Sequence, residues 1–339
     1  MVDLACGSGI LGLLALKAGA ARVYCIDEGA ILDVARESFR RNGLEDRVSL
    51  VRGRAQQVNL PERADVAVCD NVGWFGFDYG IIELLRDARA RLLKPQARVV
   101  PRALEIYVVP VESPLCMGPR IAWPAMPVEF EWLRDRWTNA KHPVELQPGQ
   151  MLATAANVGR IDLTRDSPEL FTWSARFQIE RAGVLHGLAG WFGCELGADA
   201  RMTNSPTAPE RINRPQVFLP IDEPVAVAAG EAVEVTVMAR PEEGLIAWQV
   251  SIAASGRRFD QSTFHGTALS ASHLARTSAA RVPTISPSAR ARGIVWGYCD
   301  GQRTLREIEE SVLRDFPALL PCEREIRRFV ADVLAQDAP

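Results

Sequence analysis

The amino-terminal segment constrains the fold of this chain more than any other part of the sequence. A short apolar strand at residues 2–5 runs into the glycine turn Gly7-Ser8-Gly9, and the apolar run at residues 10–19 predicts a helix. A second apolar strand at residues 23–26 then ends on Asp27. Strand, tight turn, helix and strand in this order predict a parallel α/β unit, which binds ligands at the carboxyl ends of its strands.

The same alternation of strands and helices continues to about residue 101. A charged helix is expected over residues 31–42, and a further helix over residues 81–93. Strands are expected over residues 48–51, 64–69 and 98–101. We therefore expect a Rossmann-like domain at residues 1–102, with a parallel sheet covered by helices on both faces.

Two features at the strand ends carry ligand chemistry. Glycines in the turn at residues 7–9 let the backbone approach a ligand closely, because no Cβ atom intervenes. Asp27 follows Asp3 by 24 residues, and a carboxylate at the end of the second strand can accept both hydroxyls of a ribose. The alternative interpretation is a turn that only lets the helix pack, with Asp27 as a solvated strand end.

A longer string extends this pattern into a family resemblance. Residues 2–11, Val-Asp-Leu-Ala-Cys-Gly-Ser-Gly-Ile-Leu, together with residues 23–27 and the Asn-Gly-Leu-Glu-Asp-Arg-Val string at 42–48, resemble the S-adenosylmethionine domain of the protein arginine methyltransferases. The resemblance implies S-adenosylmethionine as the cofactor, and a dinucleotide is disfavoured because a full G-x-G-x-x-G is missing. The cofactor-binding residues it implies are Asp3, Cys6, Gly7 and Gly9 at the methionine part, Asp27 at the ribose, Ala55 and Gln56 at the adenine, and also Ile10 and Leu11.

After Pro101 the pattern changes to short alternating apolar runs separated by Gly and Pro. Strands are expected over residues 104–109, 171–179, 185–195, 216–219, 232–239 and 247–253, which predicts an antiparallel barrel or sandwich. The strings at residues 186–192, 203–206 and 215–219 resemble the β-barrel domain of the same methyltransferases. We expect this substrate domain at residues 103–272. Residues 132–141 fall where the family inserts its dimerisation arm, which makes a homodimer one assembly open to the chain.

The candidate catalytic residues lie in the loop after the fourth strand. Carboxylates can hold a guanidinium and aim one of its nitrogens at a methyl donor. The family supplies two glutamates nine residues apart, whereas here Asp70 stands at the first position and Tyr79 at the second, with Asp78 beside it. We take Asp70 and Asp78 as catalytic candidates; the alternative for each is a cap of a turn or helix.

Two further departures leave the methyl acceptor open. Ile212 stands where the family has a histidine near the substrate. The family also has helices before its first strand that fold over the cofactor, whereas this sequence begins at that strand. The expectation is either a start further upstream or another cover for the cofactor. Arginine, another amine, an amide or a small molecule all remain candidate acceptors.

The carboxyl-terminal residues indicate a third module. Residues 275–288 are rich in Ser, Ala, Pro and Arg and indicate a linker. Helices are expected over residues 305–315 and 323–335, the first opened by a capping box of Thr304 and Glu307. The Cys-Asp-Gly-Gln-Arg-Thr-Leu string at 299–305 resembles PqqD-like domains, which bind leader peptides of ribosomally made, modified peptides. We expect a helical domain at residues 285–339 that recruits a peptide, or only a small docking bundle.

Composition excludes several classes of protein. With 39 Lys+Arg against 42 Asp+Glu, the net charge of −3 gives no general attraction to nucleic acid or an anionic membrane. No apolar run approaches the roughly 18 residues that a membrane helix needs. The 7 cysteines and 4 histidines are scattered, which predicts no metal site, no disulfide framework and a cytoplasmic location.

The functional prediction follows from these patterns and the resemblance together. We expect an S-adenosylmethionine-dependent N-methyltransferase similar to the protein arginine methyltransferases, acting on a peptide or protein side chain recruited partly by the PqqD-like module. One alternative is a catalytically impaired scaffold or binding protein with a methyltransferase fold, serving a peptide-modification system. The other is a small-molecule methyltransferase.

Overall fold

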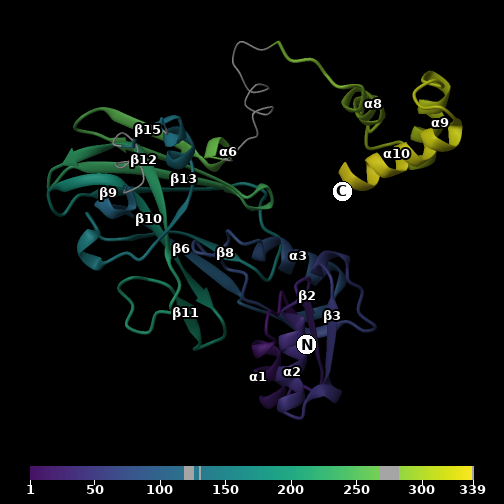
Figure 1. Cartoon of the computed structure of the whole chain (residues 1–339), viewed down its shortest axis with the longest axis horizontal. Helices are drawn as coiled ribbons and strands as arrows, with labels where there is room; N and C mark the ends of the chain where they lie inside the picture. The colour runs from purple at the N-terminus through teal and green to yellow at the C-terminus, as the bar shows by residue number, and fades with distance from the viewer. Residues whose placement is uncertain (118–125, 130, 267–281, 338–339) are drawn as a thin grey trace. The chain divides into compact units, whose positions relative to one another are not determined.

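The computed structural model describes residues 1–117, 126–129, 131–266 and 282–337 (Figure 1). The chain divides into two compact units, Met1–Ala268 and Leu269–Pro339. The predicted α/β domain and residues 103–268 of the predicted β-rich domain lie within the first unit, so the boundary proposed between them at residue 102 stays a prediction. Part of the predicted linker, residues 275–281, lies outside the described residues.

A five-stranded parallel sheet opens the first unit, in the order β3-β2-β1-β4-β5. Its strands are β1 (Val2–Leu4), β2 (Val23–Asp27), β3 (Val48–Arg52), β4 (Ala64–Cys69) and β5 (Leu93–Val100). The connecting helices are α1 (Ile10–Lys17), α2 (Leu32–Arg41) and α3 (Ile81–Arg91), with short 3-10 turns η1 (Glu45–Arg47) and η2 (Ala55–Gln57). Because β1 lies between β2 and β4, the loops after these three strands meet at one edge of the sheet.

The two faces of the sheet are buried in separate apolar clusters, as the alternation along β2 requires. Val23 and Cys25 face Phe39 of α2 and the apolar side of α1. Tyr24 and Ile26 face the opposite cluster, which includes Leu85 of α3. Helices therefore cover both faces of the sheet, as predicted.

The last parallel strand begins earlier than the prediction of residues 98–101. Leu93 already pairs with Ala64, and the register then shifts so that Val66 pairs with Arg98. Residues 94–97 form an irregularity in which Gln96 takes a positive φ of 65°. β5 is an edge strand, and this irregularity accommodates Pro95 within it. The proline is why the sequence pattern hid the start of the strand.

Two antiparallel sheets follow along the chain. The first has the order β7-β12-β10-β6-β8, with β11 paired to β10, and the second has the order β15-β14-β13-β9. The first sheet consists of β6 (Ala103–Val111), β7 (His142–Val144), β8 (Ala156–Asp162), β10 (Gly183–Glu195), β11 (Arg201–Thr203) and β12 (Gln216–Val227). The second consists of β9 (Phe171–Gln178), β13 (Ala232–Arg240), β14 (Leu245–Ile252) and β15 (Arg257–Ser262). Among the described residues the ladders stay within each sheet, so the β-rich domain is confirmed while closure into a barrel is not shown.

Short helical segments join these strands. They are η3 (Pro114–Met117), η5 (Glu131–Leu133), α5 (Arg134–Thr138), η6 (Pro148–Gln150), η7 (Pro241–Glu243) and α6 (Thr263–Gly266). The region expected to be a dimerisation arm corresponds to the end of η5, α5 and the residues that lead into β7. Helix α5 packs against β12 and α6 within the first unit.

The α/β part and the β-rich part share one apolar core. Phe75 and Phe77, from the loop after β4, are fully buried, and the Phe77 ring lies 5.6 Å from the Trp173 ring of β9. Gly190 of β10 leaves room for Phe75, because a Cβ atom there would lie 2.4 Å from the ring. The loop that carries the candidate acids is therefore anchored in the core rather than solvated.

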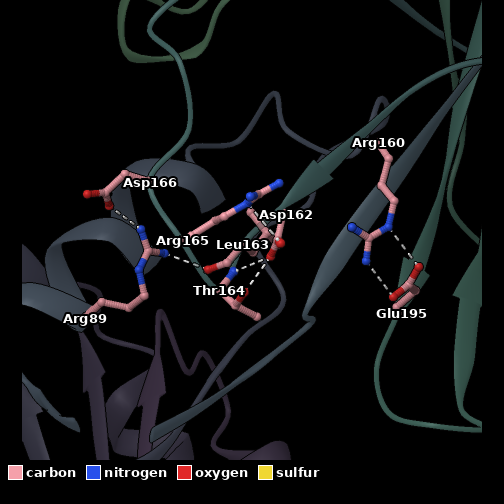
Figure 2. Close-up of polar contacts among 8 residues, drawn as sticks. All are labelled: Arg89, Arg160, Asp162, Leu163, Thr164, Arg165, Asp166 and Glu195. Atoms are coloured by element: carbon pink, nitrogen blue, oxygen red, sulfur yellow. Dashed lines mark hydrogen bonds and ion pairs between the residues drawn. The ribbon is translucent and has the colours of Figure 1, made fainter. Parts of the chain in front are cut away.

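Polar contacts also attach helix α3 to the β-rich part (Figure 2). The Arg89 guanidinium donates to the carbonyl oxygen of Leu163 at 2.6 Å and to the Asp166 carboxylate at 2.7 Å, just beyond β8. Within β8, Arg160 pairs with Glu195 of β10 through two hydrogen bonds of 3.1 and 3.0 Å. The Arg89 contacts help to fix α3, whose first turn borders the candidate site, whereas the Arg160–Glu195 pair joins two strands of one sheet.

The second unit is helical among its described residues. It contains α8 (Pro287–Trp296), α9 (Leu305–Asp315) and α10 (Glu323–Asp337). Helix α9 has the predicted bounds, α10 runs two residues beyond its predicted end at 335, and α8 was not predicted. A small core forms between them from Val295, Ile308, Val312, Ile326, Val330 and Val333. The predicted capping box is present, since the Thr304 hydroxyl accepts from the Glu307 amide and the Glu307 carboxylate accepts from the Thr304 amide. Every helix in the described part of the chain is too short or too polar to cross a bilayer.

Candidate active site

A cavity of about 860 Å³ opens at the carboxyl edge of the parallel sheet. Its walls come from the ends of β1 and β2, the segment around η2, the loop after β4, the first turn of α3 and the turn at residues 241–244. Four of the residues singled out from the sequence line it, namely Asp27, Ala55, Gln56 and Asp78. A volume of this size suits a ligand of nucleoside dimensions.

Asp27 organises the turn between β1 and α1. Its Oδ2 accepts a hydrogen bond from the Gly7 amide at 2.9 Å, and its Oδ1 accepts from the Gly29 amide at 2.8 Å. A carboxylate has about four lone-pair positions, so both oxygens keep acceptor capacity toward the cavity. Asp27 can therefore hold the glycine turn and a ligand diol at the same time.

Asp3 lies beneath the same turn and does not line the cavity. Its side chain is buried, and its Oδ2 accepts from the Gly12 amide of α1 at 2.9 Å. Burial raises the pKa of Asp3 to about 7 from an ordinary value of 3.8, against the lowering effect of the Gly12 hydrogen bond. The residue thus ties α1 to β1 and exchanges a proton near neutral pH.

The two turn glycines are required for different reasons. Gly9 has a φ of +74°, and a Cβ atom there would lie 2.8 Å from the ring of Phe39. Gly7 has a φ of +52° but faces open space. Ala5, which lines the cavity, also adopts a positive φ of 54°, a conformation that an alanine rarely takes. The glycine at position 9 therefore leaves room for Phe39, whereas the positive φ angles at positions 5 and 7 form the turn.

Three other sequence-predicted residues surround the turn without lining the cavity. Cys6 is buried, and its amide donates to the carbonyl oxygen of Ile26 at 3.0 Å. Ile10 is 54% exposed on α1, and Leu11 is half-buried. Their assignment to the cofactor stays a prediction.

Asp70, the first candidate catalytic acid, lies at the end of β4 and already has a cationic partner. Its Oδ2 accepts from the Arg214 guanidinium at 3.1 Å, and the Asp70 side chain is 49% exposed. Arg214 comes from the segment before β12, 144 residues further along the chain. No local pattern in the sequence pointed to this contact.

Asp78, the second candidate, is a buried acid that also accepts from a backbone amide of its own turn, and its catalytic role stays a prediction. Its Oδ1 accepts from the Phe75 amide at 2.9 Å, and its Oδ2 accepts from the Lys141 ammonium at 2.5 Å. The Lys141 nitrogen also lies over the rings of Trp74 and Tyr79, 5.5 and 5.4 Å from their centroids. Asp78 therefore belongs to an internal ion pair within an aromatic enclosure.

A further acid, Glu83, lies in the first turn of α3 and was not among the predicted site residues. Both of its carboxyl oxygens are shielded from solvent and have no hydrogen-bond partner among the described residues. Burial raises the pKa of Glu83, and the nearby Glu242 raises it further. Glu242 and Glu243 line the same cavity from the turn between β13 and β14, which only the tertiary fold brings there.

Asn204 connects the acid loop to the first antiparallel sheet. Its side-chain nitrogen donates to the carbonyl oxygens of Trp74 at 2.9 Å and Pro215 at 2.8 Å, and its oxygen accepts from the Phe192 amide at 3.0 Å. All the polar atoms of this buried amide are thereby occupied. The described residues contain no cluster of His, Cys, Asp and Glu suited to a metal ion.

Comparison with known protein sequences agrees with the expected enzyme class. Residues 1–96 match the family model described as a methyltransferase domain. The chain is 26% identical over 234 residues to the histone-arginine methyltransferase CARMER of Drosophila yakuba, and 25% identical to that of Drosophila erecta. Each alignment covers 62% of this chain, which spans 42% of the length of these relatives.

Solved structures show the same fold. One neighbour is the Trypanosoma brucei PRMT1 enzyme-prozyme heterotetrameric complex with AdoHcy, with a TM-score of 0.68 and 20% identity over 77% of this chain and 87% of that chain. Another is protein arginine methyltransferase 10 of Arabidopsis thaliana, with a TM-score of 0.66 and 19% identity over 77% of this chain and 88% of that chain. The comparisons confirm the predicted resemblance to protein arginine methyltransferases, whereas the PqqD-like resemblance of the second unit stays a prediction.

Proposed function

We propose that this chain is an S-adenosylmethionine-dependent N-methyltransferase that resembles the protein arginine methyltransferases and acts on a side chain of a peptide or protein. The observation that carries the proposal is the cavity at the sheet edge, which joins Asp27 and the Ala55–Gln57 turn to the loop of candidate acids. The match to a methyltransferase domain covers this whole set of residues.

The cavity suits the chemistry of S-adenosylmethionine. Asp27 has acceptor capacity for the ribose hydroxyls, and the amide of Gln56 can hydrogen-bond the edge of the adenine. One arginine lines the wall against six acids, namely Asp27, Glu28, Asp78, Glu83, Glu242 and Glu243. Such a wall favours a cationic sulfonium and disfavours the anionic diphosphate of a dinucleotide.

The protein's own residues supply positioning and a proton acceptor. When bound, S-adenosylmethionine supplies its sulfonium methyl group, so that the acceptor nitrogen forms the new N–C bond as the C–S bond breaks and its electrons remain on sulfur. Asp70 orients the acceptor nitrogen and takes the proton that this nitrogen loses. The Asn204 side chain donates to the carbonyl oxygen of Trp74 and so holds the acid loop against the β-rich part.

Assembly and recruitment form a separate part of the proposal. Trp132, in the region expected to be the arm, is 57% exposed, and Ile10 and Leu14 form an exposed apolar pair on α1. We propose a homodimer because residues 132–141 fall where the resembling family inserts its dimerisation arm. The helical second unit would recruit the peptide, and the 7 free cysteines fit a reducing cytoplasmic location.

The experiment that tests the function uses labelled S-adenosylmethionine with peptides encoded beside the gene. We expect label transfer by the wild-type chain, no transfer by Asp70→Ala, and an affinity for S-adenosylmethionine in that variant close to the wild-type value. The exposed Asp46→Ala serves as the matched control and should transfer label normally. Loss of cofactor affinity in Asp70→Ala would reassign the residue to the cofactor site.

Two other results would change the functional proposal. A wild-type chain that binds the cofactor but transfers no label to any peptide would favour a scaffold that has lost activity. Transfer that is unaffected by deletion of residues 285–339 would remove the recruitment role of the second unit and leave the enzyme.

A further inference from the structure

The most unusual feature of the candidate acceptor site is a lysine that the chain itself inserts there. Lys141 lies between α5 and β7, and its ammonium donates to the Oδ2 of Asp78 at 2.5 Å and to the carbonyl oxygen of Asp78 at 3.3 Å. Trp74 and Tyr79 present their ring faces to the same ammonium. A carboxylate with two aromatic faces is the chemistry that binds an alkylammonium.

The acid loop is built around this ion pair. A Cβ atom at Gly73, which has a φ of +67°, would lie 2.1 Å from the Oδ1 of Asp78, so only glycine leaves room for the buried carboxylate. Asn71 donates to the carbonyl oxygen of Tyr79 at 2.8 Å and closes the loop. The Asp78 side chain is 2% exposed and Lys141 is 24% exposed. Asp78 is therefore directed into the loop toward Lys141.

The other candidate acid is neutralised in the same way. Asp70 pairs with Arg214, so each of the two carboxylates carries one cation of the same chain. The Asp70–Arg214 pair is the more exposed of the two and consequently the easier to open. A cationic acceptor that enters the site meets two ion pairs whose net charge is zero.

We propose that Lys141 determines which acceptors this site takes, by holding Asp78 in an internal ion pair so that the site favours an uncharged planar nitrogen group over a guanidinium cation. The inference rests on the proposed function and deepens it. A guanidinium would have to displace Lys141 from the buried Asp78 carboxylate or lie beside a second cation, and both are unfavourable. An uncharged urea or amide needs only Asp70, after Arg214 has moved aside, as its hydrogen-bond acceptor.

The test compares the binding of two isosteric peptides to the full chain in the presence of S-adenosylhomocysteine. Gly-Arg-Gly carries a guanidinium, whereas Gly-citrulline-Gly carries an uncharged urea of the same shape. Calorimetry gives the ratio of their affinities for the wild type, Lys141→Met and Lys141→Arg. Methionine keeps the length of the side chain and removes its charge, and arginine keeps the charge.

We expect the wild type and Lys141→Arg to favour the citrulline peptide, and Lys141→Met to shift the ratio toward the arginine peptide by about 10-fold or more. An equal ratio in the wild type and Lys141→Met overturns the inference. Failure of Lys141→Met to bind the arginine peptide overturns it as well, since the freed Asp78 must then be unable to hold a guanidinium. Cofactor affinity and thermal unfolding measured on each variant report whether it is folded.

The same measurements separate this inference from the proposed function. Failure of the wild type to bind the cofactor would contradict the proposal that the chain is a methyltransferase. Normal cofactor binding with an unchanged peptide ratio would contradict only the role of Lys141.

Discussion

Replacing Asp3 by asparagine should change how the stability of the protein depends on pH. In the folded chain the buried Asp3 keeps its proton up to a pKa of about 7, whereas its ordinary value is 3.8. Between these values the folded state binds more protons than the unfolded state, so stability falls as the pH rises and levels off above the folded pKa. Asparagine has no proton to lose, and its oxygen can still accept from the Gly12 amide.

The magnitude follows from the two pKa values. Ionisation of Asp3 lowers the free energy of unfolding by about 2 kcal/mol at pH 5 and about 4 kcal/mol at pH 8. The difference in stability between Asp3→Asn and the wild type should therefore grow by roughly 2–3 kcal/mol from pH 5 to pH 8 in favour of the variant. Any constant cost of an unpaired amide cancels in this comparison.

Urea unfolding followed by tryptophan fluorescence at both pH values measures this change. The other titrating groups are common to both chains and cancel in the difference. A difference that stays the same within about 0.5 kcal/mol between pH 5 and pH 8 would refute the conclusion that burial holds Asp3 protonated.

Three further sets of substitutions test the turn and the acid loop. Gly9→Ala should lower the free energy of unfolding by roughly 2–3 kcal/mol because its Cβ atom would clash with the Phe39 ring. Gly7→Ala should lower it by only about 1 kcal/mol. Equal losses in urea unfolding would argue against the close packing at position 9. Ala5→Gly should raise the free energy of unfolding by about 0.5–1 kcal/mol, because glycine adopts the left-handed conformation of this position without strain. A lower free energy of unfolding in the variant would contradict this. Asn204→Ala should cost about 2–4 kcal/mol because three hydrogen bonds are lost, while the exposed Asn213→Ala should stay within about 0.5 kcal/mol, and similar losses in both would exclude the anchoring role.

The α/β part of the fold could be predicted because its signals are local. The glycines at 7 and 9 and the acid at 27 lie within one strand-turn-helix-strand segment, and the structure joins them directly through the Gly7–Asp27 hydrogen bond. The apolar run of β10 and the alternating apolar run of β13 were equally readable. Short or polar strands such as β8 and β11 were not predicted, because three to seven residues at a sheet edge carry little periodicity.

The electrostatics of the candidate site could not be predicted from the sequence. Lys141 lies 63 residues from Asp78, and Arg214 lies 144 residues from Asp70. Such pairs depend on how the β-rich part docks against the acid loop, which no local spacing encodes. The sequence therefore identified the two acids, but it did not reveal the cations that neutralise them.

The binding of S-adenosylmethionine at the sheet edge is the central claim, and titration calorimetry on the wild type and Asp27→Ala tests it most directly. We predict saturable binding by the wild type and an affinity lower by roughly 30-fold or more in Asp27→Ala, the effect of losing about 2 kcal/mol of charge-assisted hydrogen bonds to the ribose. Absence of saturable binding by the folded wild type, or equal affinities in the two chains, would contradict the account.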